Sequence, residues 1–282
     1  MKRTLTILLL LALTACSRYD FTGFLWMSSP SVEDRFAASM EYNKANGPFT
    51  VAVPTENYRL YVVTDVHVWK STANLDKFVA ILKADATAAP FWLSLGDIVD
   101  GQGNMPVFAE HASGAGKTLF NTMGNHDLYY SGWKDWQPLF HTSAYTVDAV
   151  LPSGARDLFI ALDSGNASLG RSQRAWLEET LAAAQGKYRH ITVFTHTHFF
   201  RKDSSQGTTS NYAMEETMDL TALFARYGVS QVLTGHDHTQ ERSLYKGVPY
   251  AVLGALKVGE PHPGYTVCTY GDSVSLEFVP VS

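Results

Sequence analysis

The feature of this chain that most restricts its fold is a series of short apolar runs, each followed by a turn that carries aspartate, asparagine or histidine. In chain order, the polar groups are Asp65-Val66-His67, Gly96-Asp97, Gly124-Asn125-His126-Asp127, His196 and Gly235-His236-Asp237-His238. Short apolar runs between turn residues are typical of buried strands. The repetition therefore predicts one site assembled from the ends of several strands.

Helical patterns separate several of these runs. Apolar residues recur at helical spacing over residues 74–88, and an apolar strand is expected over residues 91–95. Further helices are expected over residues 31–43, 172–185 and 216–227. Strand, helix, strand alternation predicts parallel strands with ligands at their carboxyl ends. The strand-like runs after residue 144 are too numerous for one simple sheet, so two sheets covered by helices are expected.

The N-terminus carries an export signal. Lys2 and Arg3 precede an apolar stretch over residues 5–13, which is too short to cross a bilayer but suits a signal peptide. The following Leu13-Thr14-Ala15-Cys16 resembles the bacterial lipobox, whose cysteine becomes the lipidated N-terminus. We therefore expect an exported protein anchored through Cys16 to the cell envelope, on its periplasmic or surface face, and in the outer membrane if the cell has one. A plain secretory signal with an incidental cysteine is the alternative.

Length and charge narrow the function further. A chain of 282 residues can form one large core. We expect a signal peptide at 1–15, a tether and helix at 16–48, and a catalytic domain at 49–282. The formal charge is −5, and loss of Lys2 and Arg3 with the signal would make it two units more negative. No basic cluster offsets this charge, so nucleic-acid polymer binding is not expected. Cys268 is the only cysteine besides Cys16, which leaves no intrachain disulfide in a lipidated protein.

The polar groups have the composition of metal ligands. Asp65 and His67 are two residues apart, so at the end of an extended strand their side chains point the same way. His236 and His238 repeat this spacing, which alone is only moderately specific, and Gly235 before them allows a close approach of the backbone. Nitrogen and oxygen donors together suit Mn, Fe or Zn rather than Ca or an all-oxygen Mg site.

Taken in this order, the motifs resemble those of the calcineurin-like metallophosphoesterase family, from about Leu60 to the C-terminus. Leu162-Asp163-Ser164 and the segment 173–177 also resemble secondary segments of that family. The resemblance implies an α/β fold, namely a four-layer α/β/β/α sandwich of two mixed β-sheets flanked by helices, with a metal site at the strand carboxyl ends. It also implies a metal-dependent phosphoric ester hydrolase, a phosphatase or phosphodiesterase.

Transferred residue by residue, the resemblance implies two divalent ions of Mn, Fe or Zn. The first ion would be held by Asp65, His67, Asp97 and His238. The second ion would be held by Asp97, Asn125, His196 and His236. Asp97 would then bridge the ions. Two divalent ions with two carboxylates carry about +2, which attracts an anionic phosphate to a negatively charged protein.

The resemblance also assigns the chemistry. A metal-activated water would attack phosphorus, His126 would protonate the leaving group, and Asp127 would orient and stabilise that histidine. His196 and His198 both follow the strand expected over residues 191–194, and His198 stands where the family commonly has proline. We assign His196 as the ligand and His198 to a substrate contact or a contact behind the ligands. Arg201, in a glycine- and serine-rich segment, is a candidate phosphate contact or a solvated loop residue.

Substrate choice should lie in the loops. The aromatic segment 128–141 either packs a cap against the core, which we favour, or stacks on a base or lipid group. The leading hypothesis is a lipid-anchored, extracytoplasmic phosphoesterase for small phosphorylated substrates, such as nucleotides, as monoesters or diesters. A membrane phospholipid or glycan phosphodiesterase is the first alternative. An inactive surface binding protein is the second, although the complete set of ligand positions, together with His126, argues against it.

Overall fold

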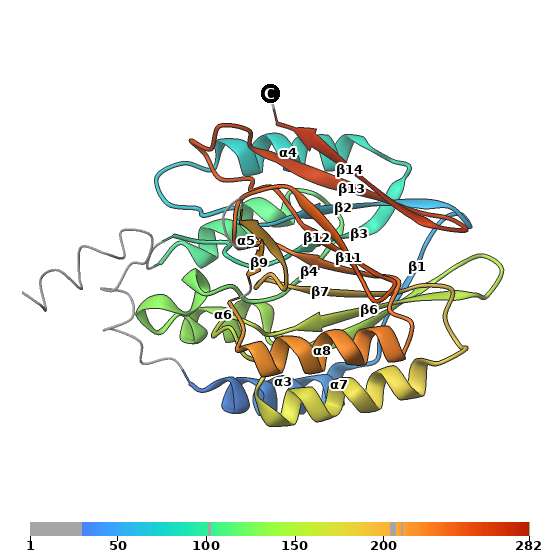
Figure 1. Cartoon of the computed structure of the whole chain (residues 1–282). Coiled ribbons are helices and arrows are strands. Elements are labelled where there is room, and N and C mark those ends of the chain that lie inside the picture. The colour runs from blue at the N-terminus through green and yellow to red at the C-terminus, as the bar shows by residue number, and fades with distance from the viewer. Residues whose placement is uncertain (1–29, 101–102, 204–206, 210, 282) are drawn as a thin grey trace, which may run out of the picture.

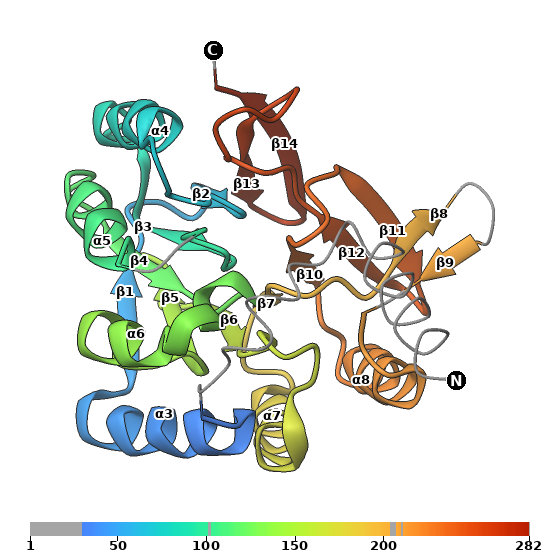
Figure 2. The ribbon, with the colours of Figure 1, turned by 90° about the vertical axis from the view of Figure 1, so that its left-hand side faces the viewer.

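The strands form two sheets that face each other, and helices cover the outer face of each sheet (Figures 1 and 2). The structure is a computed structural model that describes residues 30–100, 103–203, 207–209 and 211–281. The expected signal peptide, Cys16 and the tether before residue 30 lie outside the described residues. The four-layer α/β/β/α sandwich of two mixed sheets is confirmed.

The larger sheet has seven strands of mixed direction. Its order is β1 (Phe49–Ala52), β5 (Tyr145–Val150), β6 (Arg156–Leu162), β7 (Ile191–Thr195), β10 (Gln231–Thr234), β12 (Val248–Val252) and β11 (Glu241–Tyr245). Strands β6, β7, β10 and β12 run parallel. Their carboxyl ends therefore lie along one edge of the sheet.

The smaller sheet has five strands. Its order is β14 (Val274–Pro280), β13 (Gly264–Tyr270), β2 (Tyr58–Val63), β3 (Ala88–Ser94) and β4 (Thr118–Asn121). Strands β2, β3 and β4 run parallel, whereas β13 is antiparallel to both of its neighbours. A separate hairpin pairs β8 (Arg201–Asp203) with β9 (Gly207–Thr209).

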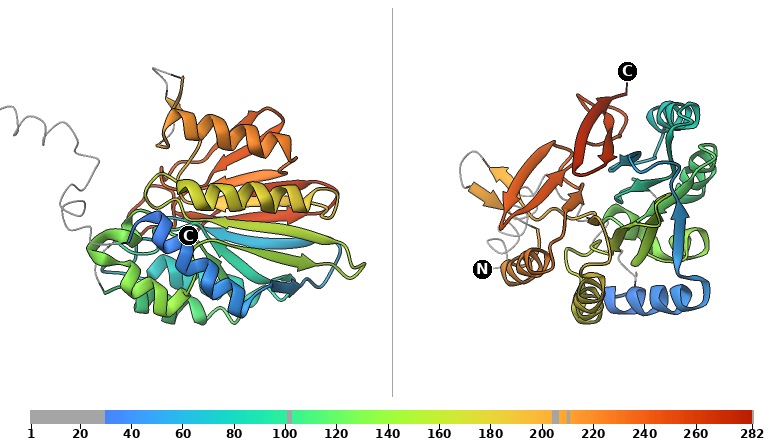
Figure 3. Two further views of the ribbon diagram at one scale, coloured as in Figure 1. Left: turned by 90° about the horizontal axis from the view of Figure 1, so that it is seen from below. Right: turned by 90° about the vertical axis from the view of Figure 1, so that its right-hand side faces the viewer.

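The helices divide between the two outer faces (Figures 2 and 3). Helices α4 (Ala73–Ala84), α5 (Met105–Ser113) and α6 (Trp133–Phe140) pack on the five-stranded sheet, and the short 3-10 helix η1 (His126–Ser131) precedes α6. Helices α7 (Gly170–Ala184) and α8 (Met214–Arg226) pack on the seven-stranded sheet. Among the described residues, no helix is long and apolar enough to cross a membrane.

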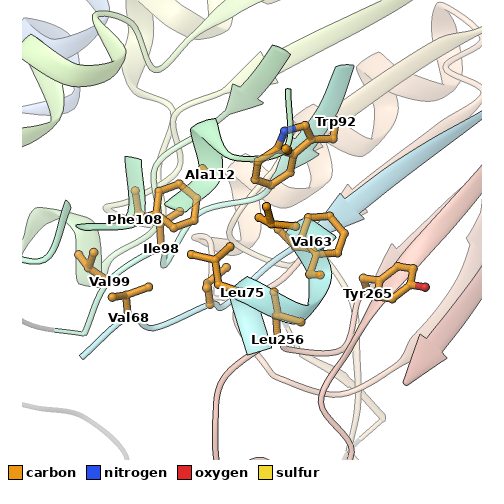
Figure 4. Packing of buried hydrophobic residues seen from close by; sticks show 14 of the residues in the cluster. Val63, Val68, Leu75, Trp92, Ile98, Val99, Phe108, Ala112, Leu256 and Tyr265 are labelled. Atoms are coloured by element: carbon orange, nitrogen blue, oxygen red, sulfur yellow. The ribbon is translucent and has the colours of Figure 1, made fainter. Parts of the chain in front are cut away.

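Strand β2 shows how the sequence pattern builds the layers. Leu60 and Val62 pack between the two sheets, whereas Tyr61 and Val63 pack against the helices. The alternation follows from the strand period of two, and both faces are apolar because both are covered. Figure 4 shows part of the helix-side core, in which Val63 lies near the α4 and β13 side chains.

An additional helix, α3 (Val32–Asn46), lies beside α7 on the same side of the seven-stranded sheet. Its N-cap is Ser31, which forms a reciprocal capping box with Asp34. The guanidinium of Arg35, which is fully buried, donates Nε and Nη2 to the two oxygens of Asp163, both at 2.8 Å. This helix, expected before the catalytic domain, is thus joined to it by a buried ion pair.

The structure differs from the sequence expectation at four places. Strand β3 begins at Ala88 rather than at residue 91. The earlier start was not foreseen because Pro90, which a regular strand does not favour, lies where the pairing with β2 is irregular. Strand β11 was not expected, because it is an edge strand of mixed polar and apolar residues without a buried apolar run. The hairpin β8–β9 and helix α6 were also not anticipated. In α6, Pro138 lies inside the helix, whereas a proline in a sequence usually marks the end of one.

Candidate metal centre

The seven predicted ligand side chains lie together at the carboxyl ends of parallel strands from both sheets. Strands β2, β3, β4, β7 and β10 deliver them in the order Asp65 and His67, Asp97, Asn125, His196, and His236 and His238. Asp65 and His238, which are 173 positions apart in the chain, are therefore in contact. Only the facing arrangement of the two sheets brings these strand ends together.

The first set of ligand atoms has the spacing of a shared ion. His67 Nε2 lies 3.1 Å from His238 Nε2 and 3.7 Å from Asp65 Oδ1. Asp65 Oδ1 is 3.3 Å from His238 Nε2, and Asp97 Oδ2 is 3.7 Å from His67 Nε2. Atoms bound at about 2.0–2.2 Å to one ion, at angles near 90–110°, lie roughly 2.8–3.6 Å apart. The distances of 3.1 and 3.3 Å lie within this range, and the two distances of 3.7 Å lie just above it.

The second set shares one atom with the first. Asp97 Oδ2 lies 3.2 Å from His196 Nε2, which is 3.1 Å from His236 Nδ1. Asn125 Oδ1 is 3.2 Å from His196 Nε2 and 2.9 Å from His236 Nδ1. Each of these distances is again that of donors around one ion. Asp97 Oδ2 is therefore placed to serve both sets.

The carboxylate of Asp65 indicates that a cation belongs here. Its Oδ2 accepts hydrogen bonds from Thr64 Oγ1 at 2.7 Å and from the His236 N–H at 2.9 Å. Its Oδ1 is fully buried and, within the described part of the chain, accepts no hydrogen bond. A buried carboxylate oxygen without a donor is costly unless a cation compensates it. The donor set and this atom both fit a bound metal ion.

The backbone at these ligands is strained. Asp65, His67, Asp97, His236 and His238 have φ angles of 50°, 49°, 50°, 75° and 56°. Side-chain-bearing residues in this left-handed region cost about 1 kcal/mol or more each. They make up five of the ten described non-glycine residues with positive φ. Strain of this kind collects at sites where the position of a side chain matters more than stability.

Two glycines of the motifs leave room for the ligand carboxylates. A Cβ on Gly124 would lie 2.0 Å from Asp97 Oδ1, and one on Gly235 would lie 2.5 Å from Asp65 Oδ2. Both contacts are shorter than real Cβ atoms tolerate. Glycine is needed at these positions because the backbone passes directly over the carboxylates of Asp97 and Asp65.

The electrostatics of the cluster favour cations. Burial opposes protonation of His67, but its contacts with Asp100 and Asp65 raise its pKa to about 10. Burial lowers the pKa of His236 to about 3, and the charge of His196 acts in the same direction. The carboxylates thus attract protons where a metal is absent, and a divalent ion would displace those protons on binding.

The resemblance assigned His126 to neither ligand set, although its ring lies near enough to His67 and Asp97 to form a third group of possible ligands with them. Its Nε2 is 4.0 Å from Asp97 Oδ2, and its side chain is 26% exposed. Its Nδ1 lies 2.8 Å from Asp100 Oδ1, and Asp100 also lies 3.4 Å from His67 Nδ1. Asp100 was missed in the sequence, although it follows Asp97 by only three residues and could have been considered with that motif.

The prediction that Asp127 orients His126 is wrong. Asp127 is fully buried, and its carboxylate accepts backbone N–H groups of Asp97, Ile98 and Gly124 at 2.9 Å and of Val99 at 3.3 Å. These bonds use both oxygens. Asp127 therefore holds the loop after β3 against the loop after β4, and Asp100 takes the place beside His126.

The remaining predicted residues lie around the second set. The buried His198 has its ring centroid 5.5 Å from that of His236, while His196 lies within the cluster. Burial lowers the pKa of His198. Arg201 Nε forms an ion pair at 3.1 Å with Asp237 Oδ2, between the two histidines of the last motif.

The aromatic segment after η1 mainly packs against the core. Trp133 and Trp136 are buried in the helix-side cluster, which agrees with the packing hypothesis for residues 128–141. Tyr129 is the exception, because its hydroxyl accepts a hydrogen bond of 3.2 Å from Asn125 Nδ2 and its ring centroid lies 4.8 Å from that of His126.

Comparison with known proteins agrees with this geometry. The model of a family described as calcineurin-like phosphoesterase matches residues 58–240. A dimetal phosphatase from Danio rerio shares 12% identity with the chain, at a TM-score of 0.60, over 80% of this chain and 96% of that one. GAP50, the anchor in the inner membrane complex of Plasmodium, has 16% sequence identity and a TM-score of 0.61. Its match covers 80% of this chain and 85% of that chain. Purple acid phosphatase PPD1 from yellow lupin has 14% sequence identity and a TM-score of 0.63. Its match covers 80% of this chain and 52% of that chain. No curated protein matches the chain.

Proposed function

Because the chain belongs to the calcineurin-like phosphoesterase family, we propose that it is a dinuclear metal-dependent hydrolase of small organic phosphate monoesters or diesters, nucleotides included. We further propose that it works outside the cytoplasm, anchored through a lipid on Cys16. The observation that carries the catalytic proposal is the position of Asp97 Oδ2, which lies next to donors of both ligand sets. A carboxylate between two ligand sets would hold two ions close together, as the two-metal mechanism of phosphoester hydrolysis needs.

The ligand residues would hold two divalent ions of Mn, Fe or Zn. When bound, such ions polarise phosphate oxygens and supply a hydroxide nucleophile at neutral pH. The chain contributes the geometry, since the left-handed backbone and the buried carboxylates fix the donors before any ion binds. Fixed donors avoid reorganisation during the reaction.

His126 would supply the proton for the leaving group. Its Nε2 faces Asp97, and its Nδ1 is beside the carboxylate of Asp100. A carboxylate at Nδ1 fixes the orientation of the ring and stabilises its doubly protonated form, in which Nε2 also carries a proton that can be donated to the leaving group. The partly exposed ring can reach a substrate oxygen, whereas the fully buried Asp127 cannot.

A substrate panel with matched variants tests this proposal. The chain from residue 17, loaded with Mn²⁺, is expected to hydrolyse an aryl phosphate monoester or diester. His126→Ala should keep the metal content and lose most of the turnover, about 100-fold or more. Asp97→Ala should lose metal together with activity. Wild-type turnover in Asp97→Ala would refute the two-metal mechanism, and no hydrolysis by the Mn-loaded wild type would refute the hydrolase proposal itself.

The lipid anchor needs a separate experiment. The support is the lipobox-like Leu13-Thr14-Ala15-Cys16 after a signal-type apolar stretch. We expect the full-length chain, expressed in a bacterium, to incorporate a labelled fatty acid and to fractionate with membranes. Cys16→Ser should remove the label and change the processing of the chain. Equal labelling of the two proteins would contradict lipidation at Cys16.

A further inference from the structure

The loop between β12 and β13, residues 253–263, reaches the metal centre although it lies beyond the segment that the family model matches. The loop is hydrogen-bonded to the ends of β10 and β2, which are two of the five strands that carry the predicted ligands. Leu253 donates its N–H to Thr234 O at 2.8 Å, at the end of β10, and Leu256 donates its N–H to Thr64 O at 3.0 Å, directly before Asp65.

The side chain of Leu256 anchors the loop. It is fully buried in the helix-side core, where Figure 4 shows it below Leu75 and near Tyr265. The Asn74 side-chain amide donates to the carbonyls of Leu256 and Lys257 at 3.0 and 3.2 Å. The backbone beyond Leu256 therefore starts from a fixed position beside the site.

From this anchor the loop places Glu260 on His238. Glu260 Oε1 lies 2.8 Å from His238 Nδ1, and the two side chains are 24% and 25% exposed. The opposite ring nitrogen, His238 Nε2, points into the first ligand set, 3.1 Å from His67 Nε2 and 3.3 Å from Asp65 Oδ1. One nitrogen is thus bound to the loop while the other faces the metal ligands.

We propose that Glu260 is a positioning residue for the first metal ion, acting through His238. It accepts the Nδ1–H of His238, which leaves the Nε2 lone pair directed at the ion. The inference deepens the proposed function and rests on its metal centre. Lys257 of the same loop lies 3.4 Å from Asp100 Oδ2, so the loop contacts both the ligand side and the His126 side of the site.

The expected effect follows from how metal-bound histidines depend on their partners. A carboxylate at the second ring nitrogen fixes the tautomer and raises the basicity of the ligand, and its loss typically costs about 10–100-fold in metal affinity. His238 belongs only to the first set, so the second ion should bind unchanged.

The test is a titration of the metal-free chain with Mn²⁺. Binding is measured by calorimetry and by the electron paramagnetic resonance signal of free Mn²⁺. Wild type should bind two ions. Glu260→Ala should raise the Kd of one ion by about 10–100-fold and leave the other unchanged. Glu260→Gln keeps an acceptor oxygen for Nδ1–H and should recover most of the affinity. Glu277→Ala is the matched control, because Glu277 is an exposed glutamate on β14, and it should bind both ions as wild type does.

Turnover adds a second measurement. Glu260→Ala should lose activity at low Mn²⁺ and regain it as Mn²⁺ is raised, because the ligands themselves remain. Unchanged affinity for both ions in Glu260→Ala overturns the inference, and so does a Glu260→Gln protein that binds as weakly as Glu260→Ala. A wild type that binds no divalent ion overturns the metal centre itself, which separates failure of the proposed function from failure of the role of Glu260.

Discussion

Replacing Asp127 with asparagine separates two roles that the sequence cannot distinguish. If Asp127 acted on His126, the change would lower turnover and leave the fold intact. In the structure its two oxygens accept four backbone N–H groups, from residues 97, 98, 99 and 124. We therefore expect a loss of stability and of metal, with the effect on turnover following from these.

The magnitude follows from counting hydrogen bonds. Asparagine keeps one acceptor oxygen, which can serve two of the four N–H groups, and turns its NH₂ toward the other two. Each buried donor left without an acceptor costs about 1–3 kcal/mol, so two of them cost roughly 2–6 kcal/mol before donor–donor repulsion is added. With a urea m value of about 3 kcal/mol/M for a protein of this size, a loss of about 4 kcal/mol lowers the unfolding midpoint by about 1 M.

The assay is urea unfolding of the metal-free chain, with Mn²⁺ content and turnover measured on the folded protein. Asp100→Asn is the matched control, because it removes the same charge from a partly exposed carboxylate beside His126. It should change stability by about 1 kcal/mol or less and lower turnover by about 10-fold or more. The reasoning is refuted if Asp127→Asn keeps the wild-type midpoint and metal content but loses turnover.

Three other predictions concern the frame of the site. Arg35→Met leaves the buried Asp163 carboxylate without its ion-pair partner and should lower the free energy of unfolding in urea by about 3–5 kcal/mol. Arg174→Met, which breaks an exposed ion pair, is the control and should lower it by no more than about 1 kcal/mol. Equal losses in the two variants would contradict the argument. Gly235→Ala should lower Mn²⁺ affinity, because its Cβ meets the carboxylate of a metal ligand; calorimetry showing wild-type binding would count against it. Burial raises the pKa of the Cys268 thiol, so in a chain beginning at residue 17 a thiol reagent should react only after denaturation, and rapid labelling of the native protein would be inconsistent with the packing.

Much of the site was predictable because metal ligands are chemically distinctive and occur at the ends of apolar strands. Asp65 and His67 follow β2, and His236 and His238 follow β10, in the positions that the motifs indicated. Each motif is local, so its spacing can be recognised without the fold. The assignment of particular residues to the two ions remains a prediction, supported by the shared position of Asp97 Oδ2.

Asp127 marks the limit of such reasoning. The resemblance implied that it orients its neighbour His126, but the turn into η1 directs its carboxylate inward to the loop after β3. The partner of His126 is Asp100, which comes from that other loop. Adjacent residues in a tight turn point in different directions, and their directions depend on backbone angles that the sequence does not reveal.

The sequence by itself determined which side chains this protein can offer to a metal, and that they follow buried strands of an α/β fold. Residue composition and the spacing of apolar residues are local properties of the chain, so they do not depend on how the strands are arranged. The tertiary structure decided which atoms meet: Asp97 Oδ2 between two ligand sets, Asp100 beside His126 and Glu260 behind His238. These contacts depend on two sheets facing each other and on loops held in left-handed conformations, because hydrogen bonds and coordination require positions accurate to a few tenths of an ångström.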